Sequence, residues 1–256
     1  MIFDTHAHYN DPRYDGDREA LLASLPGAGV GRVLMPGTSV KEQPAVLAIA
    51  ARYEFIDAAA GIHPHYPATK DELSVLEGYL RASERHKIAA VGECGLDYFN
   101  AKGYPPPDRA AQREMFDAHL CLAERYNLPV IVHDRDAHGD CLDIVRAHPG
   151  LRYVFHCFSG DAEMARTLCG MGIYISFTGS VTYKKNTALR EAAAAVPDDL
   201  LMVETDAPYL APEPLRGKRC DSLMIPHILA VLAQARGQTA EDAERLTWDN
   251  AVRFFG

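Results

Sequence analysis

The sequence lacks several features that would assign it to a specialised class of protein. None of its six cysteines forms a C-x-x-C pair, which argues against a redox motif or a zinc ribbon and indicates a reducing compartment. No apolar run reaches the length of a membrane span, and the N-terminus has no basic segment typical of a secretion signal. Asp and Glu outnumber Lys and Arg by 35 to 26, so the net charge of −9 argues against a broad basic surface for nucleic acid. We expect a cytoplasmic protein with no membrane partner, in which bound cations reverse the charge only locally.

The arrangement of apolar residues predicts an α/β fold. Short apolar runs alternate with longer amphipathic stretches, which is typical of a parallel sheet covered by helices. The expected strands are Ile2–His6, Arg32–Pro36, Phe55–Gly61, Ile88–Glu93, Pro129–His133, Tyr153–His156, Tyr174–Phe177 and Leu200–Glu204. The clearest expected helices are Lys41–Arg52, Leu73–Leu80, Arg109–Tyr126, Asp161–Cys169, Thr187–Ala195, Ile225–Ala235 and Ala240–Phe255. Eight such units predict a (β/α)₈ TIM barrel in which residues 1–256 form one domain, with its active site at the carboxyl ends of the strands.

Two histidines close together mark the end of the first expected strand. His6 and His8 are separated by Ala7, and alternate residues of a strand share one face. We therefore expect both imidazoles to point the same way, with Asp4 supporting them rather than binding a metal. Two neutral imidazoles make half of a site for zinc or a similar ion. An isolated pair of this kind is more often a surface feature, so the other strand ends decide the interpretation.

Five further expected strands also end in potential metal ligands. These are His63 with His65, Glu93 with Asp97, His133, His156, and Glu204 with Asp206. A buried cluster of imidazoles and carboxylates is costly without a cation. The number of ligands exceeds the three that one catalytic ion usually takes, which predicts two divalent ions with Glu93 as the bridge between them. Two ions about 3.5–4 Å apart can clamp a phosphoryl oxygen. The ligand types favour zinc or manganese and can also accommodate magnesium.

Together these motifs resemble the TatD-type metal-dependent deoxyribonucleases of the amidohydrolase-like TIM-barrel superfamily. The segments that carry the resemblance are Asp4 to His8, Gly61 to His65, Gly92 to Tyr98, Gln112-Arg113, His133 to Ala137, His156 to Gly160, Glu204 to Leu210 and Arg216 to Lys218. The resemblance implies one ion held by His6, His8, Glu93 and Asp206, and a second held by Glu93, His133 and His156. It also implies that His63 faces the substrate phosphate. One loop departs from the family pattern, because Cys220-Asp221-Ser222 stands where the family usually has Asn-Glu-Pro.

The resulting hypothesis is metal-assisted hydrolysis of a phosphodiester bond in DNA. Asp206 is the candidate general base for the attacking water, and His63 is the candidate group that stabilises developing charge. Arg113, Arg135 and Lys218 are candidates for neutralising neighbouring phosphates. Because the chain is acidic, we expect it to contact only a short stretch of nucleic acid. We therefore expect an exonuclease that acts on single strands or strand ends. We also expect a monomer.

Aromatic residues after the fourth strand suggest how a single strand is held. Tyr98, Phe99 and Tyr104 are the candidates for stacking on a base. Cys94 and Cys157 each follow a candidate ligand, and alternation predicts that both pack away from the barrel interior.

Two alternatives to a nuclease remain open at this stage. A pair of ions can polarise a carbonyl group as well as a phosphoryl group. The resemblance therefore leaves room for an amide or lactone hydrolase, or for removal of D-amino acids from tRNA. The second alternative is a metal-bound scaffold without enzymatic activity, which the intact set of ligand positions disfavours.

Overall fold

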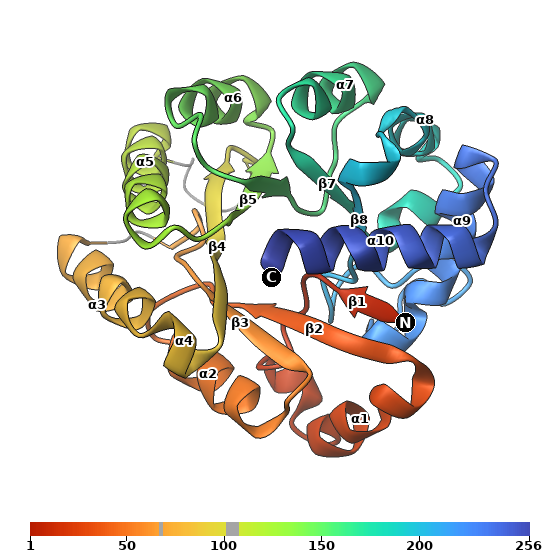
Figure 1. The fold of residues 1–256 in the computed structure, drawn as a ribbon, viewed down its shortest axis with the longest axis horizontal. Coiled ribbons are helices and arrows are strands. Elements are labelled where there is room, and N and C mark those ends of the chain that lie inside the picture. The colour runs from red at the N-terminus through yellow and green to blue at the C-terminus, as the bar shows by residue number, and fades with distance from the viewer. Residues whose placement is uncertain (67–68, 101–107) are drawn as a thin grey trace.

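Eight parallel strands and the helices around them form a barrel, seen down its axis in a computed structural model that describes residues 1–66, 69–100 and 108–256 (Figure 1). The strands are β1 Ile2–Asp4, β2 Val30–Pro36, β3 Ile56–Ala60, β4 Ile88–Asp97, β5 Val130–Arg135, β6 Tyr153–Phe155, β7 Tyr174–Phe177 and β8 Leu201–Val203. Strands pair in chain order from β1 to β8. Beyond the strand ends, the Asp206 N–H donates to the His6 carbonyl at 2.9 Å and Ala7 bridges to Ala207. These contacts nearly close the barrel and confirm the predicted fold class.

Ten helices lie in the described part of the chain, and four of them begin at a capping side chain. The ten helices are α1 Arg18–Ser24, α2 Gln43–Arg52, α3 Lys70–Arg81, α4 Ser83–His86, α5 Arg109–Tyr126, α6 His138–Ala147, α7 Ala162–Gly170, α8 Thr187–Ala195, α9 Ile225–Arg236 and α10 Ala240–Phe255. Thr69 and Glu72 form the capping box expected before α3, and Asp108 and Thr239 cap α5 and α10. None of the helices in the described part of the chain is long and apolar enough to cross a membrane.

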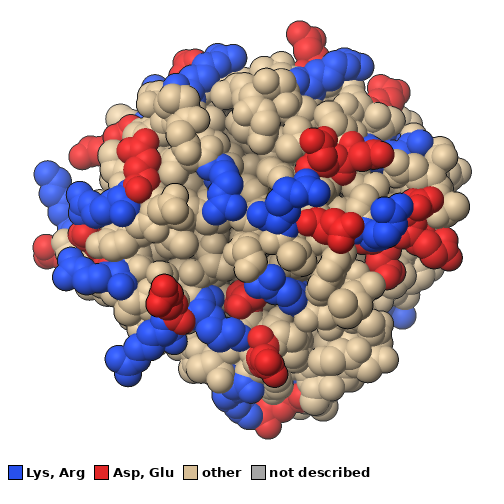
Figure 2. All heavy atoms as spheres, in the orientation of Figure 1, with Lys and Arg blue, Asp and Glu red and all other residues tan. Residues whose placement is uncertain are grey.

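The floor of the barrel is apolar and is covered by α10, which crosses the barrel axis in Figure 1. The floor residues from the strands are Phe3, Leu34, Ala59, Ala90, Ile131, Val154 and Met202. Phe254 and Phe255 of α10 pack against them, and Trp248 contacts Phe3 with 6.1 Å between ring centroids. On the face shown in Figure 2, which α10 covers, basic and acidic side chains are intermingled. This end of the molecule therefore presents no extended basic area for a polyanion among the residues drawn there.

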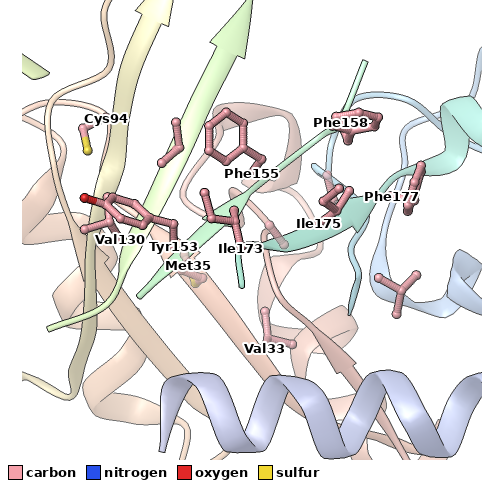
Figure 3. Close-up of a cluster of buried hydrophobic side chains, with 14 of the residues drawn as sticks. Val33, Met35, Cys94, Val130, Tyr153, Phe155, Phe158, Ile173, Ile175 and Phe177 are labelled. Atoms are coloured by element: carbon pink, nitrogen blue, oxygen red, sulfur yellow. The ribbon is translucent and has the colours of Figure 1, made fainter. Parts of the chain in front are cut away.

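The second apolar layer lies between the strands and the surrounding helices. Met35, Val130, Phe155 and Ile175 belong to this layer, part of which Figure 3 shows. Side chains alternate between this layer and the barrel interior along each strand. Above the apolar floor the interior becomes polar, because the hydroxyls of Thr5 and Ser176 lie 3.3 Å apart at full burial. The chemistry of the chain is thereby concentrated at the carboxyl ends of the strands.

Four strands end earlier than the sequence suggests, since β3 ends at Ala60 and β6 ends at Phe155. β1 ends at Asp4 and β8 at Val203, so His6, His8 and Asp206 lie in the loops that follow. His6 and His8 do lie side by side, as predicted, but strand alternation is not the cause because neither residue is in a strand. The loop itself aligns them, because its backbone bonds to the segment after β8 bend it over the barrel mouth. β4 is longer than expected and carries both Glu93 and Asp97.

Candidate metal centre

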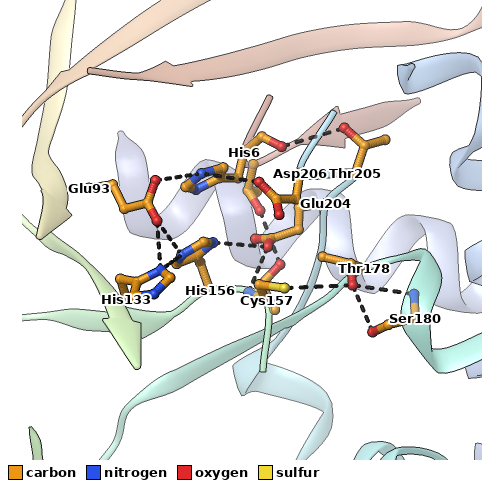
Figure 4. Close-up of polar contacts among 12 residues, drawn as sticks. His6, Glu93, His133, His156, Cys157, Thr178, Ser180, Glu204, Thr205 and Asp206 are labelled. Carbon is orange, nitrogen blue, oxygen red and sulfur yellow. Dashed lines mark hydrogen bonds and ion pairs between the residues drawn. The ribbon is translucent and has the colours of Figure 1, made fainter. Parts of the chain in front are cut away.

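A cavity of about 1080 Å³ opens at the carboxyl ends of the strands. The candidate site residues that line it are His8, His63, Glu93, His133, Arg135, His156 and Asp206. His6 lies beneath them and is fully buried. Figure 4 shows one oxygen of Glu93 facing the imidazole of His6 and the other facing those of His133 and His156.

The first group of ligand atoms surrounds Glu93 Oε2. The His6 Nε2 atom lies 3.3 Å from this oxygen and 3.1 Å from His8 Nε2. Asp206 Oδ1 lies 3.4 Å from His8 Nε2 and 3.8 Å from His6 Nε2. Ligands about 2.1 Å from a tetrahedral ion are separated by about 3.4 Å. These four side chains therefore fit around one divalent cation.

The second group of ligand atoms surrounds the other oxygen of Glu93. His133 Nδ1 lies 2.8 Å from Glu93 Oε1, His156 Nε2 lies 2.9 Å from it, and the two nitrogens are 3.2 Å apart. This group also fits a cation, and Glu93 contributes one oxygen to each group. Glu93 is only 3% exposed, and several imidazole nitrogens crowd around it. Burying these polar and charged groups costs free energy, and a pair of bound cations would offset that cost.

The charges of the site are coupled. Burial opposes ionisation of Glu93, but His156, His63 and His6 hold the pKa of its carboxyl well below its usual range. Burial likewise opposes ionisation of Asp206, whereas its contact with His8 lowers the pKa of that carboxyl. Both carboxylates are therefore ready to bind cations without first losing a proton.

Two carboxylates that the sequence offered as potential ligands, but to which it gave no role, lie beside the second group. Asp97 Oδ2 lies 3.2 Å from His133 Nε2, and Glu204 Oε1 lies 3.3 Å from His156 Nδ1. Each imidazole is thus held between Glu93 and a second carboxylate, an arrangement that fixes the ring of a metal-binding histidine. The sequence contained a signal for both roles, because Asp97 and Glu204 lie four and two residues from candidate ligands on the same strand ends.

His63 faces the second group and has a defined tautomer. Its Nδ1 accepts a hydrogen bond from the His65 N–H at 3.1 Å, so the proton of the neutral ring is on Nε2, which lies 3.5 Å from Glu93 Oε1. Burial and the neighbouring His133 lower the pKa of His63 to about 3. The ring is therefore a neutral donor that points into the cavity.

Asp4 and the loop that departs from the family pattern lie directly beneath the first group. Asp4 is fully buried and accepts hydrogen bonds from the Thr205 N–H at 2.9 Å and the Ser222 hydroxyl at 2.6 Å. The geometry agrees with a supporting role for Asp4. Asp206 itself has a φ of 56°, which non-glycine residues rarely adopt.

Some predicted substrate contacts are not brought to the cavity. Arg113 on α5 pairs with Asp140 at 2.9 Å, and Lys218 is exposed in the loop after β8. Neither residue is among those that line the cavity. Arg135 does line the cavity and lies over the ring of Phe99, with 3.8 Å to its centroid.

One of the three predicted stacking residues is placed differently, whereas Phe99 is exposed at 42%. Tyr98 is buried with its hydroxyl on Asp140, which removes it from the surface, and Tyr104 falls outside the described residues. Cys94 is buried as predicted, but the prediction for Cys157 was wrong. Cys157 has a φ of 44°, so strand alternation does not apply to it, and it lines the cavity.

Further charged and aromatic side chains also line the cavity. Lys41 and Lys185 add two cationic groups, and Tyr66 and Tyr209 are exposed aromatic rings at 47% and 49%. One face of Tyr209 is covered by the guanidinium of Arg13, 4.2 Å from the ring centroid. The cavity therefore combines cations, aromatic surface and a candidate metal centre.

Comparisons with known proteins give a consistent result. The sequence model of the TatD-related DNases matches residues 3–256. The chain is 35% identical over 259 residues to the uncharacterized metal-dependent hydrolase YabD of Bacillus subtilis, covering 100% of this chain and 99% of that protein. It is 36% identical over 263 residues to the 3'-5' ssDNA/RNA exonuclease TatD of Cronobacter sakazakii, covering 99% and 97%. The crystal structure of the TatD homologue YjjV of Escherichia coli superposes with a TM-score of 0.92 at 32% identity, covering 99% and 97%.

Proposed function

Because this chain belongs to the TatD-related DNase family and is a metal-dependent hydrolase, we propose that it hydrolyses phosphodiester bonds at the ends of single-stranded DNA. The observation that carries the proposal is the position of Glu93, whose two oxygens face separate pairs of imidazoles 2.8–3.7 Å away. Such a bridging carboxylate is suited to a pair of ions that clamp one phosphoryl group.

The proposed ligands divide at Glu93. One ion is held by His6, His8, Glu93 and Asp206, and the other by Glu93, His133 and His156. When bound, these ions would polarise the phosphoryl group and lower the pKa of water in the site. Manganese, zinc and magnesium are the candidate ions.

The side chains of the protein supply the remaining chemistry. Asp206 lies at the edge of the first group as a carboxylate and accepts the proton of the attacking water. The His63 Nε2–H donates to a phosphoryl oxygen and stabilises the charge that develops there. Arg135, Lys41 and Lys185 neutralise the phosphates that flank the scissile bond.

The form of the cavity favours a single strand with a free end. Its cations are few and lie at the cavity itself, whereas the chain as a whole carries a net charge of −9. Tyr66 and Tyr209 offer exposed rings for unpaired bases, which a duplex keeps stacked on one another. The Cronobacter relative is named a 3'-5' exonuclease of ssDNA and RNA, and we propose the same direction of digestion for this chain.

The test is digestion of a single-stranded oligonucleotide labelled at its 5' end. Metal-stripped protein is incubated with and without Mn²⁺ or Mg²⁺, beside the Glu93→Ala variant. We expect a ladder that shortens from the 3' end, requires the metal and is absent in the variant. A circular single strand is the matched control and is expected to resist digestion.

Several results would overturn the proposal. Cleavage of the circular strand would contradict action from an end, and shortening from the 5' end would contradict the direction. No cleavage by protein shown to bind two ions would reject the nuclease. A parallel assay on a lactone and an aminoacyl ester then tests the carbonyl hydrolase that the sequence left open.

A further inference from the structure

Ser222 belongs to a buried network that connects the loop after β8 to the first group of candidate ligands. Its side chain is fully buried, as are those of Tyr9 and Asp4. The Ser222 N–H donates to the Tyr9 hydroxyl at 2.9 Å, and the Tyr9 hydroxyl lies 2.7 Å from Ser222 Oγ. Since the Ser222 hydroxyl donates to Asp4 at 2.6 Å, Tyr9 is the donor to Ser222. Every hydroxyl proton in this network therefore has a defined acceptor.

Asp4 is also connected by hydrogen bonds to the backbone on both sides of Asp206. Its Oδ1 accepts from the Thr205 N–H at 2.9 Å and its Oδ2 accepts from the Thr205 hydroxyl at 2.7 Å. Thr205 Oγ1 in turn accepts from the Ala207 N–H at 3.1 Å. The residues before and after Asp206 are thus tied to one carboxylate, directly or through one hydroxyl.

The restraint matters because Asp206 has an uncommon backbone conformation. A φ of 56° is rare among non-glycine residues, although aspartate tolerates it better than most, and contacts on both sides of Asp206 help to hold it. The same carboxylate also holds the other side of the ligand group, since the His6 N–H lies 3.4 Å from Asp4 Oδ1. Asp4 therefore fixes His6 and Asp206 relative to each other, and the Ser222 hydroxyl fixes Asp4.

We propose that Ser222 is a positioning residue that acts through Asp4 and sets the affinity of the ion held by His6, His8 and Asp206. The second group of ligands shares Glu93 with the first, but the other nitrogens of His133 and His156 lie 3.2 Å from Asp97 and 3.3 Å from Glu204 rather than against Asp4. Loss of the Ser222 hydroxyl therefore weakens one ion and spares the other. The inference rests on the proposed two-ion site.

The test is a titration of metal-stripped protein with Mn²⁺, followed by calorimetry and by the electron paramagnetic resonance signal of free Mn²⁺. In Ser222→Ala we expect one of two ions to bind about 10- to 100-fold more weakly, the effect typical of losing a group that orients a ligand. Thr205→Val removes the other hydroxyl on Asp4 at nearly constant volume and is expected to weaken the same ion. It tests the network independently if Ser222→Ala folds poorly.

Ser176→Ala is the matched control, because its hydroxyl is equally buried but is bonded to Thr5 rather than to Asp4. We expect both serine variants to lose thermal stability in the metal-free state, and only Ser222→Ala to lose ion affinity. Unchanged affinities in Ser222→Ala and Thr205→Val, or equal loss at both ions, would overturn the inference. Failure of the wild-type protein to bind two ions would instead reject the proposed metal centre, so the two failures are distinguishable.

Discussion

Asp206 meets two demands at one position, a carboxylate at the metal centre and a backbone φ of 56°. Asparagine has the same shape and is the other residue that tolerates this backbone region well. Asp206→Asn is therefore expected to unfold at the same urea concentration as the wild type when both are metal-free. Its turnover of single-stranded DNA is expected to fall by at least about 100-fold, because a charged ligand and proton acceptor is lost. Urea unfolding followed by a turnover assay measures both effects.

Asp206→Ala separates the two demands. Alanine lacks the carboxylate and is also strained at positive φ, so this variant is expected to lose stability as well as turnover. If Asp206→Asn keeps most of its activity, Asp206 is neither the base nor a required ligand.

His63 is expected to act as a donor whose protonation does not change during catalysis. His63→Ala removes the Nε2–H, and loss of one donor to a developing oxyanion typically lowers kcat by about 10²- to 10³-fold. Because burial and His133 lower its pKa to about 3, the ring is neutral throughout the range from pH 5 to 9. The plots of kcat against pH for the variant and the wild type are therefore expected to be parallel. A shift of the acidic limb in the variant would show that His63 titrates in this range, against the assigned role.

At the scale of residues, the sequence was sufficient to identify candidate metal ligands, but not the buried side chains that hold those ligands in position. His6, Glu93 and His133 could be found because each lies at the end of an apolar run, where a barrel gathers its chemistry. The contact between Ser222 and Asp4 joins residues 218 positions apart, and no local pattern predicts it. The outward pairing of Arg113 with Asp140 could not be predicted for the same reason.

At the scale of elements, one imidazole at the end of α6 pairs with two carboxylates of α5. His148 lies 3.0 Å from Asp117 and 2.8 Å from Glu124, both on α5. Burial opposes protonation of His148, but the two carboxylates raise the pKa of its imidazole. A raised pKa stabilises the fold below the unfolded value of about 6.5, and this stabilisation is lost as the pH rises through the folded pKa.

His148→Gln is therefore expected to lower the free energy of unfolding more at pH 5.5 than at pH 9. Urea unfolding of the variant and the wild type at both pH values measures this difference. The control is His227→Gln, which removes an imidazole from the exposed face of α9. An equal loss of stability at both pH values would mean that His148 contributes by packing rather than by charge.

The sequence predicted the bounds of α5, α8 and α10 because their amphipathic patterns extend to their ends. It failed at the ends of the strands. β1 stops at Asp4 because the segment beyond it bonds to the loop after β8, which is a tertiary effect. β4 extends to Asp97 across Gly92 and Gly95, where a Cβ would collide with the neighbouring β5. Such close approach is invisible until the partner strand is known.

At the scale of the whole molecule, the two ends of the barrel have separate tasks. The alternation of apolar runs and amphipathic stretches was sufficient to predict the barrel, but not that α10 covers its floor. With that floor apolar, the buried ionisable groups of the barrel interior, such as His6, Glu93 and His156, lie at the opposite end. The proposed ligands come from the ends of β1, β4, β5, β6 and β8, so bound ions would connect most of the circumference of the barrel.

This connection predicts that metal binding stabilises the entire fold. Ions that bind only the folded chain, at about 100 times their dissociation constant, contribute about 2.7 kcal/mol per site, or roughly 5–10 °C in Tm for a chain of this size.

Trp248 is the single tryptophan, and it lies at the opposite end of the barrel from the cavity, against Phe3. Its fluorescence therefore reports unfolding of the barrel without contact with the ions. Thermal unfolding with and without Mn²⁺ is expected to show this rise in the wild type and a smaller one in Glu93→Ala, which lacks the shared ligand. If the wild type has the same Tm with and without the metal, the ligand groups at the strand ends do not bind ions tightly enough to stabilise the fold.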